Sequence, residues 1–307
     1  MRRAAEKMIS GTYLVCVRLA KVCVLGLACG IVISASAQEA DQRQNTIVGI
    51  GVCPPWNAQS GEVCKYSVET VVGAFSDRLG IEPSETRLMF NEGASADGLK
   101  RTITELANKL DQNDRLIIYA NLPSKGIDLI GDGSQSRQVL ELWADHEPET
   151  ADTAIENGIW ISAPAFAAML HTIPAGEVIL ILDTSNSDTI DPDLLESHST
   201  NLDDRPEVLV TSAGAGQKAN YSSDRTIALF AKHLAASLET TTGSLQQAMM
   251  LAAAGTRQAA IPICMDLKEK MPVEDPEKNC TQVPEIHDPA GLLAALQLPD
   301  LPEDVQN

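Results

Sequence analysis

The stretch EVILILD at residues 177–183 is the most informative about the fold, because five branched apolar residues stand in a row between two acidic ones. An uninterrupted apolar run of this length predicts a strand that is buried on both faces of a sheet. A second run of the same kind is RLIIYA at residues 115–120. Shorter apolar and β-branched runs predict three more strands, at residues 46–52, 86–90 and 207–212.

Helices are predicted between these strands. Residues 66–80 carry apolar side chains at helical spacing as far as Gly80, and residues 95–110 show the same pattern. Further along the chain we expect a hairpin at 126–144 with its turn at 131–133, an acidic loop at 145–157, a helix at 162–171, a loop at 184–206, and helices at about 224–239 and 244–255.

The alternation of strands and helices predicts the fold class and the place of the site. It is typical of an α/β protein with a mostly parallel sheet that helices cover on both faces. In such sheets, functional residues gather at the carboxyl ends of the strands. The loops after Val52, Ala120, Asp183 and Ser212 are therefore the region in which to look for a site.

The first 37 residues differ from the rest of the chain. Basic residues precede an apolar run at residues 22–33, and ASA at residues 35–37 is a small-x-small cleavage pattern. Residues 1–37 are therefore interpreted as a secretory signal peptide, followed by a polar linker at residues 38–45. The apolar run is too short for the roughly 20 residues that span a bilayer. We expect a periplasmic or extracellular protein with no stable membrane span after cleavage; the alternative is an uncleaved anchor that includes residues 13–17.

Composition narrows the classes of partner. The chain carries 23 Lys and Arg against 42 Asp and Glu, for a formal net charge of −19 at pH 7. Such a protein repels a phosphate backbone, so nucleic acid is not expected as a partner. Aromatic residues make up 4% of the chain, which argues against base-stacking platforms. The apolar fraction of 44% is that of a folded protein.

Four cysteines follow the signal peptide: Cys53, Cys64, Cys264 and Cys280. They form two local pairs, which predicts the disulfides Cys53–Cys64 and Cys264–Cys280 in an oxidising compartment, although three pairings are possible. A metal site is disfavoured because no CxxC is present and no histidine stands at zinc-finger spacing. A nucleophilic role for Cys53 or Cys64 is the remaining alternative.

Familiar cofactor and catalytic motifs are missing from the sequence. It contains no GxGxxG, GxxxxGK[ST], HExxH or GxSxG, so no cofactor and no metal are expected. Among the histidines, only His146 is expected to approach the carboxyl edge of the sheet. One acidic cluster could bind Ca²⁺, although its spacing fits no EF-hand and a solvated loop is the preferred interpretation; it consists of Asp183, Asp188, Asp191 and Asp193.

The sequences at the ends of two predicted strands resemble motifs of the caspase/metacaspase family. In that family an apolar strand with an aromatic residue runs into Ser-Gly-His-Gly, and here RLIIYA is followed by NLPSKG at residues 121–126. The second motif is an apolar strand that runs into Asp-x-Cys-His-Ser-Gly, and here EVILILD is followed by TSNS at residues 184–187. The resemblance implies a caspase-like three-layer α/β/α sandwich over residues 46–255. Residues 256–307 would then be a Pro-rich, acidic C-terminal extension with a disulfide loop.

The same resemblance implies that the catalytic dyad is lost. Aligning Tyr119 with the family's aromatic residue puts Pro123 at the catalytic histidine, and aligning Asp183 puts Ser185 at the catalytic cysteine. Asn186 stands where the second motif has its histidine. Peptide hydrolysis in this family needs a thiolate and an imidazole, and proline has no ionisable group. Asp183 and Asn186 form a possible residual pocket, because in basic-specific relatives this aspartate helps to line the pocket for Arg or Lys.

Three functions follow, in order of preference. The first is an exported caspase-fold pseudoenzyme that binds an unidentified protein or peptide. The second is a divergent peptidase that uses Ser185 with a relocated base such as His146, which must then lie within hydrogen-bond reach of Ser185. The third is an unrelated α/β protein with a small-molecule pocket at the strand ends. The sequence gives no indication of the oligomeric state.

Overall fold

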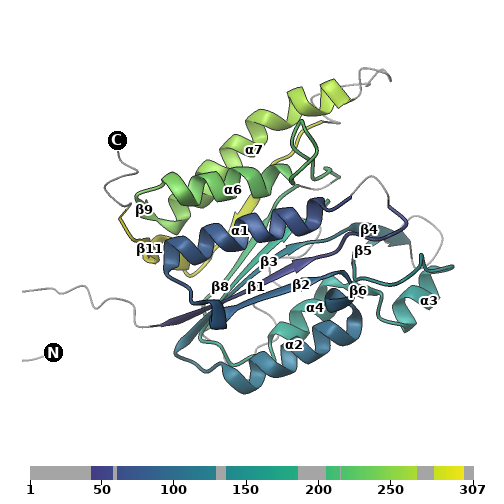
Figure 1. Cartoon of the computed structure of the whole chain (residues 1–307), viewed down its shortest axis with the longest axis horizontal. Helices are drawn as coiled ribbons and strands as arrows, with labels where there is room; N and C mark the ends of the chain where they lie inside the picture. Colours follow the sequence, from purple (N-terminus) through teal and green to yellow (C-terminus); the bar gives the residue numbers. More distant parts are fainter. Residues whose placement is uncertain are drawn as a thin grey trace, which may run out of the picture. The chain divides into compact units, whose positions relative to one another are not determined.

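Six strands form the central sheet of the computed structural model, which describes residues 43–57, 61–128, 136–185, 205–214, 216–267 and 280–300 (Figure 1). Their order across the sheet is β10-β8-β7-β3-β1-β2. Five strands are parallel: β1 (Gln44–Gly51), β2 (Thr86–Phe90), β3 (Asp114–Asn121), β7 (Glu177–Asp183) and β8 (Glu207–Thr211). The sixth, β10 (Glu285–His287), is antiparallel to β8. The predicted α/β fold with a mostly parallel sheet is therefore confirmed.

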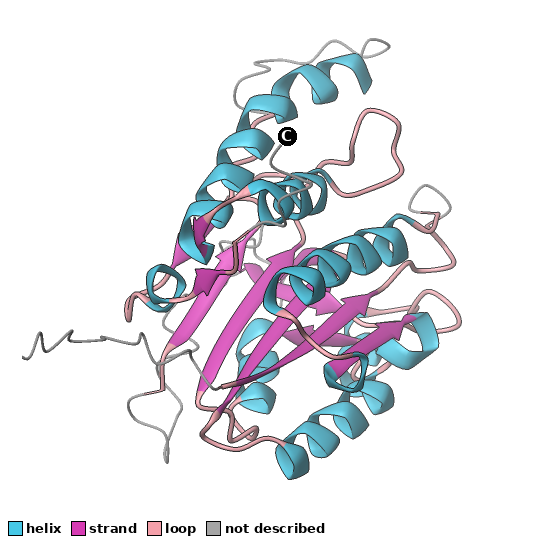
Figure 2. Ribbon diagram, turned by 60° about the vertical axis from the view of Figure 1, so that its left-hand side comes forward, coloured by secondary structure: helices cyan, strands magenta, loops and turns pink. Residues whose placement is uncertain are grey.

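Helices cover both faces of this sheet, which makes three layers (Figures 1 and 2). One face packs against α1 (Val63–Leu79) and α6 (Leu229–Thr240), with α7 (Leu245–Leu267) beside α6. The other face packs against α2 (Ala96–Lys109) and α4 (Ala163–Leu170). Short 3₁₀ turns flank β2 at Pro83–Glu85 and Asn91–Ala94.

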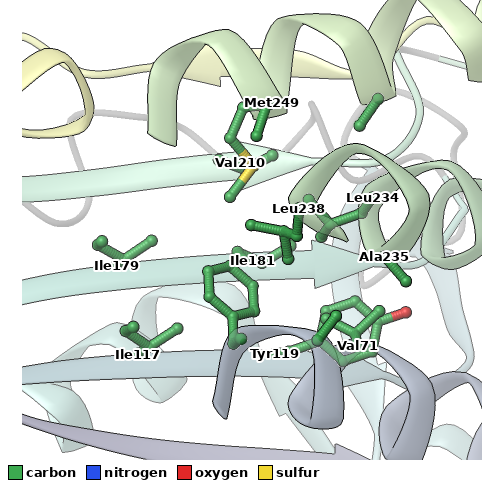
Figure 3. Packing of buried hydrophobic residues seen from close by; sticks show 14 of the residues in the cluster. Val71, Ile117, Tyr119, Ile179, Ile181, Val210, Leu234, Ala235, Leu238 and Met249 are labelled. Atoms are coloured by element: carbon green, nitrogen blue, oxygen red, sulfur yellow. The ribbon is translucent and has the colours of Figure 1, made fainter. Parts of the chain in front are cut away.

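Side chains of each strand alternate between the two hydrophobic layers. In β3, Ile117 and Tyr119 belong to the layer under α1 and α6, whereas Leu116 and Ile118 belong to the layer under α2 and α4. This is the period of two that a strand imposes, and it explains why the central strands are apolar at every position. Figure 3 shows Tyr119 and Ile181 among side chains of α6 in the first layer.

A second, smaller sheet follows β3. It consists of β4 (Ser124–Asp128), β5 (Ser136–Glu141) and β6 (Trp160–Ser162), all antiparallel. The predicted hairpin is thus present with a third strand added, while its expected turn at 131–133 lies outside the described residues. The expected acidic loop at 145–157 instead contains α3 (Ala151–Glu156), because Thr150 caps that helix by accepting a hydrogen bond from the Thr153 amide at 3.1 Å.

The carboxyl-terminal part of the chain is more regular than predicted. Helix α7 continues to Leu267 across Pro262, although its expected end was residue 255. The described residues beyond it supply β10 to the central sheet and also form α9 (Leu292–Ala295). They end with β11 (Gln297–Leu298), which pairs with β9 (Gly243–Ser244). Helix α6 begins at Leu229 rather than near 224, because Asp224 accepts hydrogen bonds from Ser222 and Thr226 in a local turn before it.

Both predicted disulfides are formed, Cys53–Cys64 and Cys264–Cys280. The predicted signal peptide lies outside the described residues, as do Asn186 and the aspartates at 188, 191 and 193 of the acidic cluster. Within the described part of the chain, no helix has the length and apolar character needed to cross a bilayer.

Candidate functional site

The carboxyl ends of β1, β3 and β7 meet at a cleft of about 190 Å³, which we name the carboxyl-edge cleft. Parallel strands bring their ends to one edge of the sheet, so residues far apart in sequence become neighbours there. The candidate positions Pro123, Asp183 and Ser185 all line it. The described lining residues are Val52, Asn57, Cys64, Asn121, Leu122, Pro123, Ser124, Asp183, Thr184, Ser185, Ala219, Asn220, Tyr221 and Ala228.

Asp183 lies at the end of β7 and is 2% exposed. Its Oδ2 accepts a hydrogen bond of 2.7 Å from the hydroxyl of Tyr119, which is itself fully buried. Burial raises the pKa of Asp183 above its ordinary value, and the hydrogen bond from Tyr119 opposes that rise. Oδ1 is buried as well and has no hydrogen-bond partner among the described residues. Thr184 Oγ1 is also buried and has no hydrogen-bond partner among the described residues.

Ser185 is held by hydrogen bonds from three other segments of the chain. Its Oγ accepts a hydrogen bond of 3.1 Å from the amide of Ala219, in the segment after β8. Its carbonyl oxygen accepts hydrogen bonds from Ser124 and, at 3.2 Å, from Gln138. The serine oxygen is therefore positioned by a backbone donor, and none of these contacts would remove a proton from it.

Pro123 stands between β3 and β4 and lines the cleft. Its carbonyl oxygen accepts a hydrogen bond of 2.9 Å from the amide of Glu141, which anchors this turn to β5. Its pyrrolidine ring offers the cleft neither a donor nor an acceptor.

Four residues at the cleft were not foreseen as parts of a site. Asn121 donates a hydrogen bond of 3.1 Å to the carbonyl oxygen of Asp183 and joins β3 to β7. Tyr221 is half-buried, and burial, followed by the negative charge of Asp183, raises the pKa of its hydroxyl. Asn57 and Asn220 complete the polar part of the lining. Only their proximity to strand ends could have indicated them, because polar residues in loops are too common to predict a site.

The histidines described by the structure lie away from the cleft. His146 is exposed and is not among the residues that line the cleft. His171 ends α4, and its Nε2 lies 3.6 Å from Oε1 of Glu207 at the beginning of β8, which is the opposite edge of the sheet. His233 packs against α7 near Gly255, and burial lowers its pKa. His287 is part of β10.

Buried ion pairs at that opposite edge have a structural role. Arg115 at the start of β3 pairs with Glu177 at the start of β7, with 2.6 Å between Nη2 and Oε2. The Arg115–Glu177 pair joins β3 to β7 at their amino ends. Arg205, just before β8, pairs with Glu207 at the start of that strand and donates a hydrogen bond of 2.8 Å to the carbonyl oxygen of Ile173. No group of three or more His, Cys, Asp and Glu side chains in the described ranges could hold a metal ion.

Comparisons with known proteins place the chain by its fold. No protein-family model matches the sequence, and no curated protein matches it significantly. Among solved structures, the chain is similar to protein GSU0716 from Geobacter sulfurreducens, with a TM-score of 0.53 at 12% identity over 84% of this chain and 98% of that one. A caspase-1 from Spodoptera frugiperda gives a TM-score of 0.43 at 11% identity over 80% of this chain and 89% of that one. Raptor from Chaetomium thermophilum gives 0.38 at 12% identity over 64% of this chain and 18% of that one. At these identities the similarity concerns the fold alone.

Proposed function

We propose that this chain is an exported, catalytically inactive caspase-fold protein that binds a peptide or protein segment in the carboxyl-edge cleft. The observation that carries the proposal is the lining of that cleft. It includes polar side chains such as Asn121 and Asn220, while Pro123 and Ser185 occupy the positions at which the resemblance to caspases would require an imidazole and a thiol. The one described cysteine in the lining, Cys64, is engaged in a disulfide.

Two buried oxygens support a ligand with hydrogen-bond donors. Asp183 Oδ1 and Thr184 Oγ1 line the cleft region but have almost no accessible surface, so a ligand donor would reach them once neighbouring side chains move aside. A cationic Arg or Lys side chain would also supply the positive charge that favours the ionised form of Asp183. The net charge of −19 attracts such cationic ligands over a longer range.

The same cleft offers little support for hydrolysis. A serine nucleophile depends on a neighbouring base that takes its proton. The atom bonded to Ser185 Oγ is the amide nitrogen of Ala219, which is a donor. Losing a nucleophile or its base costs several orders of magnitude in rate. Export, the second part of the proposal, is supported by the two disulfides, which persist in oxidising compartments.

Peptide binding and peptide cleavage can be tested together on the purified exported protein. The probes are end-blocked pentapeptides that contain one arginine, and otherwise identical peptides in which citrulline replaces it. We expect the arginine peptides to bind more tightly, and Asp183→Asn to weaken them about tenfold or more, because a buried charge pair is lost. Asp152→Asn, a change of the same charge at an exposed site on α3, is the matched control and should leave binding unchanged.

Two results would overturn the proposal. Equal affinity for arginine and citrulline peptides, unchanged by Asp183→Asn, would remove the carboxyl-edge cleft as the binding site. Reproducible cleavage that is lost in Ser185→Ala would establish a hydrolase in its place. In that case His146→Ala would show whether the exposed histidine is the relocated base.

A further inference from the structure

A second cavity, of about 510 Å³, lies on the α2 and α4 side of the molecule. The small sheet, α2, α3 and α4 border it, it is open to solvent on one side, and it shares no described lining residue with the carboxyl-edge cleft. Its volume is within the usual range for sites that bind small molecules. We name it the lateral cavity.

The walls of the lateral cavity are apolar. Leu99 of α2 and Met169 of α4 face it from the helices, and Ile127, Val139 and Trp160 face it from the small sheet. These sheet residues are buried, and Lys125 lies 3.7 Å from the centre of the Trp160 ring. The lateral cavity therefore suits the hydrocarbon or aryl part of a ligand.

Small residues keep this space open. Ala96 of α2 and Ala165 of α4 both line the lateral cavity, where a longer side chain would fill it. Gly158 also lines it, and a Cβ at that position would lie 3.2 Å from the Cβ of Ala96. Gly158 has a φ of +66°, so the turn after α3 itself requires glycine.

The rim of the lateral cavity carries charge. Lys100 of α2 is exposed, and its ammonium group makes no hydrogen bond or ion pair within the part of the chain that the structure describes. By contrast, Lys109 on the same helix pairs with Glu85 at 2.5 Å. On the α3 side, Glu156 is exposed and also lines the rim.

Two helix amino ends lie on the Lys100 side, where Asp97 in the first turn of α2 offsets part of the charge of that helix end. Ala96 is the first residue of α2, and Ser162 is the N-cap of α4, so the amino ends of two helices border the lateral cavity. A helix amino end carries partial positive charge, which favours a nearby anion. Glu156 repels negative charge on a ligand, so a single carboxylate placed beside Lys100 fits this rim better than a dianion.

We infer that the lateral cavity binds a small monocarboxylate amphiphile, whose acyl or aryl body lies among the apolar walls and whose carboxylate contacts Lys100. This binding activity goes beyond peptide binding at the carboxyl-edge cleft and does not depend on it. The two sites use different residues, so each can be tested while the other is intact.

Decanoate is the probe, used with the purified exported protein below the concentration at which it forms micelles. We expect saturable binding by calorimetry together with a change in tryptophan fluorescence that is lost in Trp160→Phe. Decylamine, which has the same chain and the opposite charge, should bind more weakly. Asp183→Asn should leave decanoate binding unchanged, which separates this site from the proposed peptide site.

Substitutions distinguish the walls from the rim. Ala165→Leu and, independently, Ala96→Leu should weaken decanoate about tenfold or more by occupying its space, with folding checked by thermal unfolding. Lys100→Ala should weaken it up to about fivefold, which is the range of an exposed ion pair. Arg101→Ala removes the same charge from the next residue of α2 and is the matched control.

The inference is overturned by any of three outcomes. Decanoate could fail to bind, or it could bind equally well to both leucine variants when these are folded. Decylamine could bind at least as tightly as decanoate, with Lys100→Ala and Arg101→Ala alike in effect. The last outcome would show that the rim does not select a carboxylate.

Discussion

Replacing Asp183 by asparagine should change the pH dependence of folding. Burial raises the pKa of Asp183 in the folded protein, whereas in the unfolded chain the carboxyl group is solvated. Between the unfolded and the folded pKa, the folded state therefore binds more protons than the unfolded state. Linkage then requires the free energy of unfolding to fall as the pH rises through that window, from about 4 upwards.

The size of the effect follows from the contacts of the carboxyl group. Asp183 is 2% exposed. Its Oδ2 accepts a hydrogen bond of 2.7 Å from the Tyr119 hydroxyl, and its Oδ1 has no geometric hydrogen-bond partner among the described residues. An unsatisfied buried group costs about 1–3 kcal/mol, and more when it is charged. Asparagine has nearly the same shape and is neutral at every pH. We expect the free energy of unfolding of Asp183→Asn to exceed that of the wild type by about 1–3 kcal/mol at pH 7. At pH 3.5 the two free energies of unfolding should be nearly equal.

Urea denaturation at half-unit pH steps measures both curves, and Asp152→Asn serves as the exposed control. Parallel pH profiles for wild type and Asp183→Asn would contradict the prediction. They would mean that Asp183 has the same pKa in the folded and the unfolded state. A wild type that gains stability on going from pH 4 to pH 7, with that gain lost in Asp183→Asn, would show the opposite sign. Asp183 would then be an ionised residue stabilised by its surroundings.

Three further changes test other parts of the structure by denaturant unfolding. Removing the Cys53–Cys64 disulfide, with both residues changed to serine, should cost about 2.7 kcal/mol from the loop entropy of an 11-residue separation; an unchanged midpoint would contradict this. Arg115→Met should cost about 3 kcal/mol, the lower end for breaking a buried ion pair, because Glu177 keeps its contact with Arg43 at 3.0 Å; the additional change Glu177→Leu should restore much of the loss. Gly49→Ala should cost about 1–3 kcal/mol, because the added Cβ would lie 2.4 Å from a valine methyl group of α1; a neutral result would mean that the helix shifts freely.

The central strands could be predicted because their burial leaves a simple trace in the sequence. β7 and β3 are buried at almost every position, so the residues read as continuous apolar runs. β10 leaves no such trace, because its three residues include Glu285 and His287 and its pairing with β8 depends on the folded sheet. The sequence does not predict α7 beyond residue 255. Proline normally ends a helix, and Pro262 lies inside this part of α7.

The candidate site was predictable in its position and less so in its contacts. Asp183 and Ser185 follow an evident strand, and strand order brings them to one edge with Pro123. The hydrogen bond between Tyr119 and Asp183 joins residues 64 apart, and no local pattern specifies such a pair. The lateral cavity depends on how four elements pack, which hydrophobic periodicity does not encode.

The position of β10 has a consequence for the order of events when the protein is made. β8 has β7 on one side, and on the other it is covered by residues 285–287, which are synthesised long after the rest of the sheet. Until those residues emerge, β8 presents a row of unpaired backbone groups to any neighbouring chain. The sheet is therefore completed only after residues 285–287 have been synthesised, and β8 stays an open edge until then.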